Sequence, residues 1–169
     1  MTSPSDAAEA TANTPASITL PVPQCSAELR FVWQHDRYAH QLWVNDECVL
    51  ASVEGDSAED WPASAPVQQL SLEPIEDNAT ALGVGAAGTS HWSLSVQAQD
   101  FGQGQCALVF DWACRVKQAP GFLGSTYQGA WVDRLEPVGE SSAAGSGVVT
   151  ASDGHEGPTR QWRYHVRLS

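Results

Sequence analysis

The stretch Cys106-Ala-Leu-Val-Phe-Asp-Trp-Ala-Cys-Arg-Val116 decides the fold class. Its even-numbered residues are all apolar, whereas its odd-numbered residues are mixed and include Asp111 and Arg115. Because successive side chains of a strand point to opposite faces, this alternation predicts a strand with one buried face. A sheet with one covered face and one mixed face is typical of antiparallel architecture.

The same alternation recurs along the chain, most clearly over residues 91–98 and 161–168, and convincing helical periodicity is absent. About eleven short strands separated by turn signals predict an all-β fold. We expect an antiparallel β-sandwich or jelly-roll-like single domain over residues 17–169. Residues 1–16 are rich in Ala, Ser, Thr and Pro, and we expect them to form a disordered leader. The remaining candidate strands cover residues 18–22, 27–34, 38–44, 49–53, 67–73, 80–84, 126–132 and 148–151.

The charge composition disfavours two classes of partner. The chain of 169 residues has 20 acidic and 8 basic residues, which gives a formal net charge of −12. A general nucleic-acid binder needs cations along the phosphates, and attachment to anionic lipid needs them too. We therefore expect neither nucleic acid nor a membrane as a partner.

No stretch has the length and apolarity of a membrane span, and the first residues do not resemble a secretory signal, so we expect a cytoplasmic protein.

The four cysteines form no C-x-x-C pair, so zinc-ribbon and thioredoxin-like sites have no support. Cys106 and Cys114 lie on one predicted strand, about 26 Å apart, which is too far for a disulfide. In a reducing compartment, buried free thiols are the default expectation for all four. A bridge between Cys25 and Cys48 is the alternative if the protein is exported.

Several segments together resemble a set of conserved proteins of planctomycete-type bacteria that has no assigned activity. The resemblance covers roughly residues 27–130 and implies a shared fold. It implies no substrate and transfers no functional residue. The segments that carry it are HDRYAH (35–40), SVEGDSAEDWPASAPVQQL (52–70), GAAGTSHWSLSV (85–96), FDWACRV (110–116) and FLGSTY (122–127).

The last predicted strand carries an unusual concentration of cations for so acidic a chain. Arg163, His165 and Arg167 project from one of its faces. One interpretation is cross-strand pairing with acidic neighbours, and the other is recognition of an anion. Asp111, in the middle of its own strand, likewise needs a partner, for which we expect a cross-strand arginine. We add His91 and Trp61, which lies in the long loop 54–66, as candidate ligand-binding residues.

The candidate residues for metal binding are weaker than those for ligand binding. His35 and His40 flank the predicted first hairpin with Asp36 between them, but H-x4-H is not a recognised ligand spacing. Polar hairpin residues near the surface are the alternative interpretation. The carboxylates between Glu54 and Asp60 lack the D-x-D-x-D-G order with which one loop wraps Ca²⁺.

No motif indicates catalysis. A G-x-S-x-G elbow is absent, and the G-x-G-x-x-G match at residues 83–88 is followed by a strand pattern rather than a helix. We therefore expect no cofactor and a non-catalytic binding or protein-interaction domain, whose partner is a protein or a small molecule, with an anionic ligand or partner as one form of it. One alternative is a small metal-dependent cupin-like enzyme that uses His35, His40 and His91. The other is a carbohydrate-binding module that uses exposed rings among the seven tryptophans.

Overall fold

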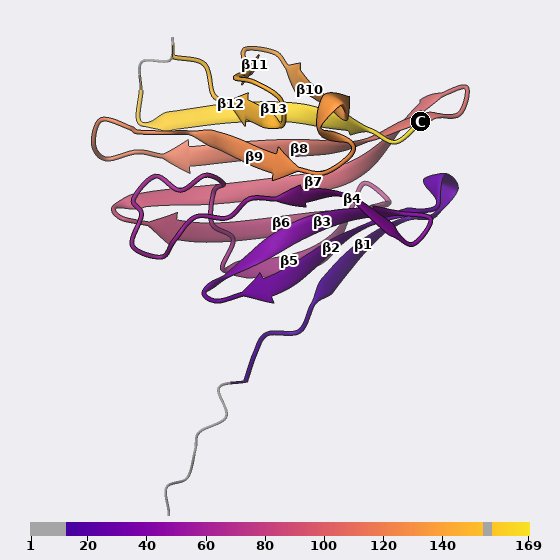
Figure 1. Cartoon of the computed structure of the whole chain (residues 1–169), viewed down its shortest axis with the longest axis horizontal. Helices are drawn as coiled ribbons and strands as arrows, with labels where there is room; N and C mark the ends of the chain where they lie inside the picture. Colours follow the sequence, from indigo (N-terminus) through magenta and orange to yellow (C-terminus); the bar gives the residue numbers. More distant parts are fainter. Residues whose placement is uncertain (1–12, 154–156) are drawn as a thin grey trace, which may run out of the picture.

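Two antiparallel β-sheets pack face to face in the computed structural model, which describes residues 13–153 and 157–169 (Figure 1). The predicted antiparallel β-sandwich is thereby confirmed. The first sheet has seven strands in the order β1-β2-β3-β4-β9-β12-β11, and the second has six in the order β10-β13-β8-β7-β6-β5. The first comprises β1 (Ile18–Val22), β2 (Ala27–Gln34), β3 (Arg37–Val44), β4 (Glu47–Ser52), β9 (Gly124–Gln128), β11 (Ser142–Ala143) and β12 (Val148–Thr150). The second comprises β5 (Gln69–Ile75), β6 (Asn78–Ala87), β7 (Ser90–Gly102), β8 (Gln105–Arg115), β10 (Leu135–Val138) and β13 (Thr159–Arg167).

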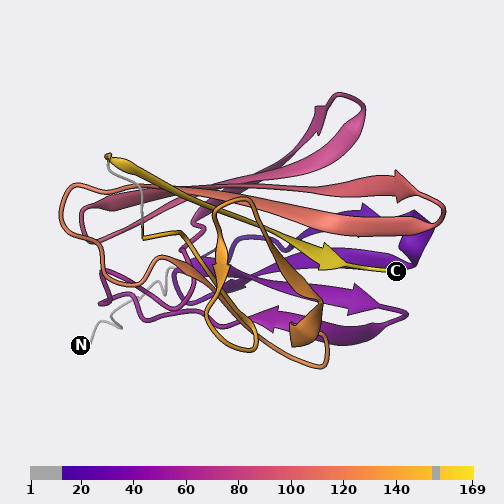
Figure 2. The same cartoon turned by 90° about the horizontal axis from the view of Figure 1, so that it is seen from above.

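The chain builds each sheet mainly from consecutive hairpins. Strands β1 to β4 form one meander, and β5 to β8 form a second meander in the other layer (Figure 2). The chain then returns to the first sheet with β9, and β13 inserts between β8 and β10. Three of the four outermost strands, β1, β5 and β10, contain a proline, namely Pro21, Pro74 and Pro137.

The core lies between the sheets and is rich in stacked aromatic rings. Trp112 of β8 stacks on Trp162 of β13 with ring centroids 5.8 Å apart, and Phe110 stacks on Tyr164 at 5.0 Å. Both pairs are direct cross-strand partners. The even-numbered residues of the Cys106–Cys114 run are at most 5% exposed, as the alternation predicts. Because each such ring removes about 200 Å² from water, the aromatic pairs contribute several kcal/mol of gross hydrophobic stabilisation.

Two strands lack the pattern that identifies the others. Neither β10 nor β11 has a run of alternating apolar residues, and β11 is only two residues long. Pairing with β13 holds β10 in place, with Leu135 opposite Val166. Tertiary pairing therefore creates strands where local sequence does not predict them.

The chain outside the strands is mostly turns. Two short 3₁₀ helices, η1 (Pro23–Cys25) and η2 (Val132–Arg134), follow β1 and precede β10. The predicted leader lies outside the described residues up to residue 12, and residues 13–16 have no regular secondary structure. No helix within the described ranges is long and apolar enough to cross a membrane.

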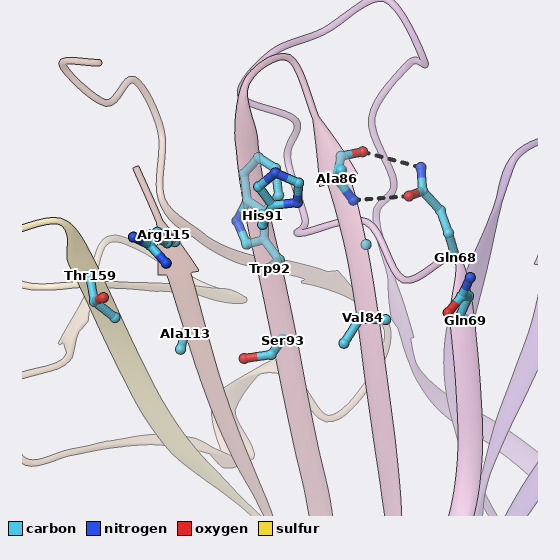
Figure 3. Close-up of a pocket in the computed structure, with 11 residues that line it drawn as sticks. Gln68, Gln69, Val84, Ala86, His91, Trp92, Ser93, Ala113, Arg115 and Thr159 are labelled. Carbon is cyan, nitrogen blue, oxygen red and sulfur yellow. Dashed lines mark hydrogen bonds between the residues drawn. The ribbon is translucent and has the colours of Figure 1, made fainter. Parts of the chain in front are cut away.

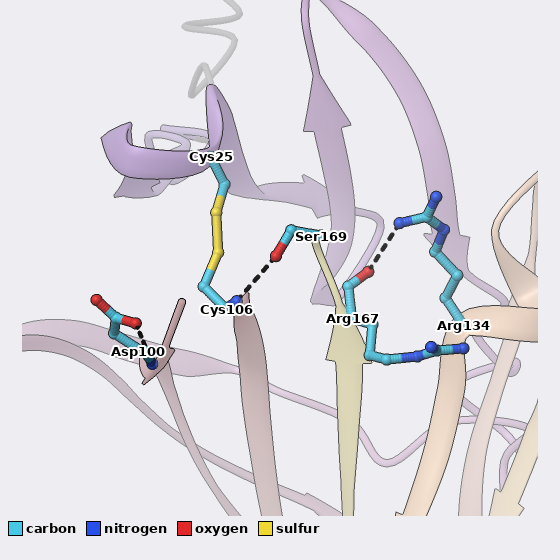
Figure 4. The surroundings of a disulfide bond; sticks show 7 residues. Cys25, Asp100, Cys106, Arg134, Arg167 and Ser169 are labelled. Atoms are coloured by element: carbon cyan, nitrogen blue, oxygen red, sulfur yellow. Dashed lines mark hydrogen bonds between the residues drawn. A yellow bond between two sulfur atoms is a disulfide. The ribbon is translucent and has the colours of Figure 1, made fainter. Parts of the chain in front are cut away.

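A disulfide joins Cys25 to Cys106 and corrects the expectation that both are free thiols (Figure 4). Cys25 ends η1 beside the first sheet, and Cys106 lies near the start of β8 in the second, so the bond links the two layers at one end. The C-terminal Ser169 closes the same end, because its Oγ accepts a hydrogen bond from the Cys106 N–H at 2.9 Å. Cys48 and Cys114 are free, so the alternative pairing of Cys25 with Cys48 is also wrong. The spacing of the cysteines along the sequence did not predict this disulfide, because the bonded residues lie 81 positions apart.

Candidate functional site

The predicted cationic face of β13 exists, but carboxylates already neutralise much of its charge. Arg163, His165 and Arg167 point outwards, whereas the residues between them are buried. Arg167 Nε lies 2.7 Å from Glu136 Oε1 on β10, and Arg163 Nε lies 3.9 Å from Asp111 Oδ2 on β8. The expected arginine partner of Asp111 is thereby confirmed. Of the two interpretations of this face, cross-strand pairing is the one that the contacts support.

His165 adds little positive charge between the two arginines. Its ring packs against Phe101, with ring centroids 5.6 Å apart. Burial lowers the pKa of His165, the charge of Arg163 lowers it further, and Glu136 only partly opposes them. Since an ordinary histidine already titrates below neutral pH, the imidazole is predominantly uncharged at pH 7.

A different cation, Arg115, lies at one end of the same outer face. His91 of β7, Arg115 of β8 and Thr159 of β13 lie in register across three neighbouring strands. Side chains directly opposite each other on antiparallel strands have Cβ atoms about 5 Å apart, so these three gather at one place. Arg115 is exposed and forms no ion pair with any residue in the described ranges.

These side chains line a shallow pocket of about 500 Å³ (Figure 3). Ser93 contributes a hydroxyl beside the His91–Arg115–Thr159 row, and Val84 and Ala113 contribute apolar contact area. Val84 is 49% exposed, so it leaves apolar surface uncovered in the pocket. The pocket thus combines a cation that the described residues leave without an ion pair, polar groups and an uncovered apolar patch, as small-molecule sites often do.

Gln68 forms one wall of this pocket, which we call the Arg115 pocket. Its side-chain amide donates to the Ala86 carbonyl at 3.1 Å and accepts from the Ala86 N–H at 2.9 Å (Figure 3). Gly85 permits this close approach, because a Cβ there would lie 2.0 Å from the carbonyl oxygen of Pro66. The wall is therefore held by backbone contacts rather than by a freely rotating side chain.

Trp61 lies elsewhere and packs inwards. Its ring meets that of Trp92 edge to face, with centroids 6.1 Å apart, and it is absent from the lining of the Arg115 pocket. A Cβ on Gly121 would come within 2.7 Å of the same ring. Trp61 thus fixes the long loop against the core, and His91 is the one predicted ligand-binding residue that lines this pocket.

The tryptophans form no exposed platform. All seven lie in the described ranges, and none is among the exposed large hydrophobic side chains. Trp43 is covered by the Arg30 guanidinium at 4.1 Å, and Trp131 is covered by that of Arg134 at 3.8 Å. The stacking surface on which the carbohydrate-binding alternative relied is therefore already occupied by the protein's own side chains.

The structure does not bring the histidines together for metal binding. His35 is exposed in the turn after β2, His40 is buried in the core, and His91 lies on the outer face of the other sheet. Within the described residues, no group of three or more His, Cys, Asp or Glu side chains is placed to hold a metal ion. Neither the His35–His40 pair nor the cupin-like set thus has a geometry that supports it.

His40 instead begins a buried hydrogen-bonded chain that sequence reasoning did not find. His40 Nε2 lies 2.6 Å from the Tyr127 hydroxyl, which lies 2.5 Å from the Tyr164 hydroxyl. Trp112 Nε1 donates to Tyr164 at 3.1 Å. Burial lowers the pKa of His40 to about 3 and raises that of Tyr164 to about 12, so both are neutral at pH 7. All four side chains are at most 5% exposed, and we therefore assign this hydrogen-bonded chain to the core.

A second pocket, of about 720 Å³, lies on the outer face of the first sheet. Arg37 and Glu54 both line it. Burial raises the pKa of Glu54 to about 7, and the hydrogen bond from Ser52 and the charge of Arg37 only partly oppose it. Sequence reasoning counted Glu54 among the loop carboxylates and gave Arg37 no role. We call this second site the Arg37 pocket.

No protein-family model matches the chain, and no curated protein or solved structure matches it significantly. The resemblance to planctomycete-type proteins stays a prediction. Because folds are shared by many functions, a function must here be argued from the side chains of the two pockets.

Proposed function

We propose that the protein is a non-catalytic binding domain whose Arg115 pocket receives the anionic group of a small molecule. The observation that supports this most strongly is the guanidinium of Arg115, which lies in a concave site and has no ion-pair partner among residues 13–153 and 157–169. A guanidinium binds carboxylate or phosphate through two parallel N–H donors. The hydroxyls of Thr159 and Ser93 and the imidazole of His91 supply further hydrogen bonds, and Val84 contacts an apolar part of the ligand.

The Arg163–Arg167 face is a poorer anion site than the Arg115 pocket. An anion there has to compete with Glu136, which already lies 2.7 Å from Arg167. Exposed ion pairs of this kind stabilise a protein by about 0–1 kcal/mol. We expect Arg167→Gln to lower thermal stability slightly and to leave anion binding at Arg115 unchanged.

Arg115→Gln is expected to weaken binding of a small anion by about tenfold or more, because a charge-assisted hydrogen bond contributes roughly 1.5–3 kcal/mol. Inorganic phosphate and succinate are suitable probes, with binding followed by NMR shifts of the backbone amides of His91 and Thr159. Arg30→Gln is the matched control, because it removes the same charge from the other sheet. The proposal is wrong if neither anion shifts these signals, or if the two variants bind equally well.

A further inference from the structure

The Arg37 pocket contains buried polar atoms that the protein itself leaves without partners. Arg37 is 2% exposed, and its Nε and Nη2 donate to the two carboxylate oxygens of Asp36 at 2.9 and 3.1 Å. Its third nitrogen, Nη1, is buried and has no hydrogen-bond partner. Because nearly all buried polar groups in native proteins are paired, such an atom in a pocket wall points to a ligand.

Glu54 presents the complementary atom. Its Oε1 accepts a hydrogen bond from Ser52 Oγ at 2.6 Å, whereas its Oε2 is buried and unpaired. Arg37 and Glu54 line the same pocket without forming an ion pair, although their charges interact. The two residues that line this pocket thus carry one unpaired donor and one unpaired acceptor, which do not pair with each other.

The loop that carries Glu54 is held firmly against the sheet. The Val53 N–H donates to the Thr126 carbonyl at 2.8 Å, and Thr126 Oγ1 donates to the Ala63 carbonyl at 2.7 Å. A Cβ on Gly55 would lie 2.2 Å from the Cβ of Pro62, so the loop can close this tightly only with glycine. Such anchoring keeps the pocket formed before a ligand arrives, which lowers the entropic cost of binding.

We propose that the Arg37 pocket binds a neutral polyhydroxylated ligand, a sugar, through hydroxyl groups placed between Arg37 Nη1 and Glu54 Oε2. A hydroxyl accepts from the guanidinium and donates to the carboxylate, whereas a carboxylate or phosphate satisfies only the first. The amides of Gln41 and Gln128 also line the pocket, and each can both donate and accept.

The ligand expected in the Arg37 pocket also differs in charge from the ligand expected in the Arg115 pocket. Asp36 already offsets the charge of Arg37, and Asp56 and Glu54 make the remaining lining acidic or neutral, which disfavours anions. The two pockets lie on opposite sheets and take ligands of different charge. The proposal of a sugar site is therefore independent of the proposal of an anion site, and an experiment can disprove either one without affecting the other.

The test is an NMR titration of the ¹⁵N-labelled full chain with four probes: D-glucose, D-galactose, D-mannose and N-acetyl-D-glucosamine. We expect at least one of them to shift the Arg37 Nε–H and the Gln128 side-chain amide signals in a saturable manner. Gln128 is exposed and makes no hydrogen bond through its side chain among the described contacts, so Gln128→Ala should fold normally. We expect this variant to weaken the sugar by about tenfold.

Two further variants make the result decisive. Arg37→Lys keeps the charge but removes the planar fork, and we expect a similar loss of affinity. Gln69→Ala removes the same amide from the Arg115 pocket, and we expect unchanged sugar binding. The inference is overturned if none of the four sugars gives saturable shifts, which leaves water as the partner of both atoms. It is also overturned if the shifts map to the Arg115 pocket, or if Gln128→Ala and Arg37→Lys bind as the parent does.

Discussion

Replacement of Cys25 and Cys106 together by alanine is expected to lower the melting temperature by about 10 °C or more. The disulfide spans 81 residues, and a cross-link that closes a loop of this length stabilises a protein by about 4.5 kcal/mol in the chain-entropy account. In a chain of 169 residues, each kcal/mol corresponds to roughly 2–4 °C. Thermal unfolding followed by circular dichroism without reductant measures the change.

The free cysteine of β4 supplies the control. Cys48 is exposed and unbonded, so Cys48→Ala should change the melting temperature little. Reductant should lower the melting temperature of the parent protein and should not affect the double variant. If the parent melts identically with and without reductant, and the double variant matches it, then the bond does not contribute as expected.

The same bond bears on where the protein resides. Structural disulfides persist in oxidising compartments and are rare in the cytosol. The expectation of four free thiols followed from the expected cytoplasmic location, and it is wrong for Cys25 and Cys106. We now propose an oxidising compartment. Trapping of free thiols in intact cells by alkylation, followed by mass analysis, should show these two cysteines protected and Cys48 labelled.

Glu54→Gln and His40→Gln are expected to change the pH dependence of stability in opposite directions. Each removes one group whose pKa differs between the folded and unfolded states, and such a difference makes the free energy of unfolding depend on pH. The comparison of each variant with the parent isolates its group from the other carboxylates of this acidic chain. Chemical denaturation at a series of pH values between 3 and 8 provides the free energies.

For His40, the folded state disfavours the charged form. Burial lowers the pKa of His40 from 6.5 to about 3, so between these values the unfolded chain binds the proton and the folded protein does not. Acid therefore destabilises the parent through this group, starting as the pH falls below 6.5. The loss reaches about 4 kcal/mol near pH 3. His40→Gln keeps a polar partner for Tyr127 and should not show this loss.

For Glu54, the folded state also disfavours the charged form. The charged form of a carboxyl is the deprotonated one, so the pH dependence has the opposite sign from that of His40. Burial raises its pKa from 4.5 to about 7, so between these values the folded protein binds the proton and the unfolded chain does not. Stability contributed by this group is therefore fully present below pH 4.5 and decreases as the pH rises to 7. The decrease is about 3 kcal/mol at most, because the carboxyl borders a pocket.

These two contributions oppose each other between pH 4.5 and 6.5. In the parent protein, the gain in stability from His40 with rising pH is largely offset by the loss from Glu54. As the pH falls from 6.5 to 4.5, Glu54→Gln should therefore lose stability steeply, whereas the parent should lose little over this range. His40→Gln should instead become less stable as the pH rises from 4.5 to 7. Parallel pH profiles for the parent and both variants would contradict this account.

The sequence predicted the sheets well because burial on one face imposes a pattern of period two. The stretch Cys106–Val116 shows this pattern without interruption, and β1 and β2 have the bounds that alternation indicates. The pattern does not predict β10 and β11, because their strand conformation depends on pairing with β13 and β12. The pattern also does not predict which strands face each other across the core, so the Cys25–Cys106 bond could not be predicted from it.

The candidate sites were less predictable for a related reason. Alternation placed Arg163 and Arg167 correctly on an outer face, and their acidic partners lie on neighbouring strands whose order the sequence does not specify. Arg115 is present in the sequence, but the lack of an ion pair between it and the carboxylates of the described residues depends on strand order. Arg37 is buried and shares its pocket with residues 53–57 of a distant loop, whereas a charged residue after a hairpin turn normally indicates exposure.

The outermost strands restrict how this protein meets other proteins. Each free sheet edge offers unpaired N–H and C=O groups, to which another chain can add a strand. Pro21, Pro74 and Pro137 interrupt three of these four edges, because proline has no N–H with which to extend a ladder. The fourth edge, β11, is only two residues long. Edge-to-edge association and strand exchange are thus disfavoured, and binding partners are left with the faces of the sheets and the pockets on them.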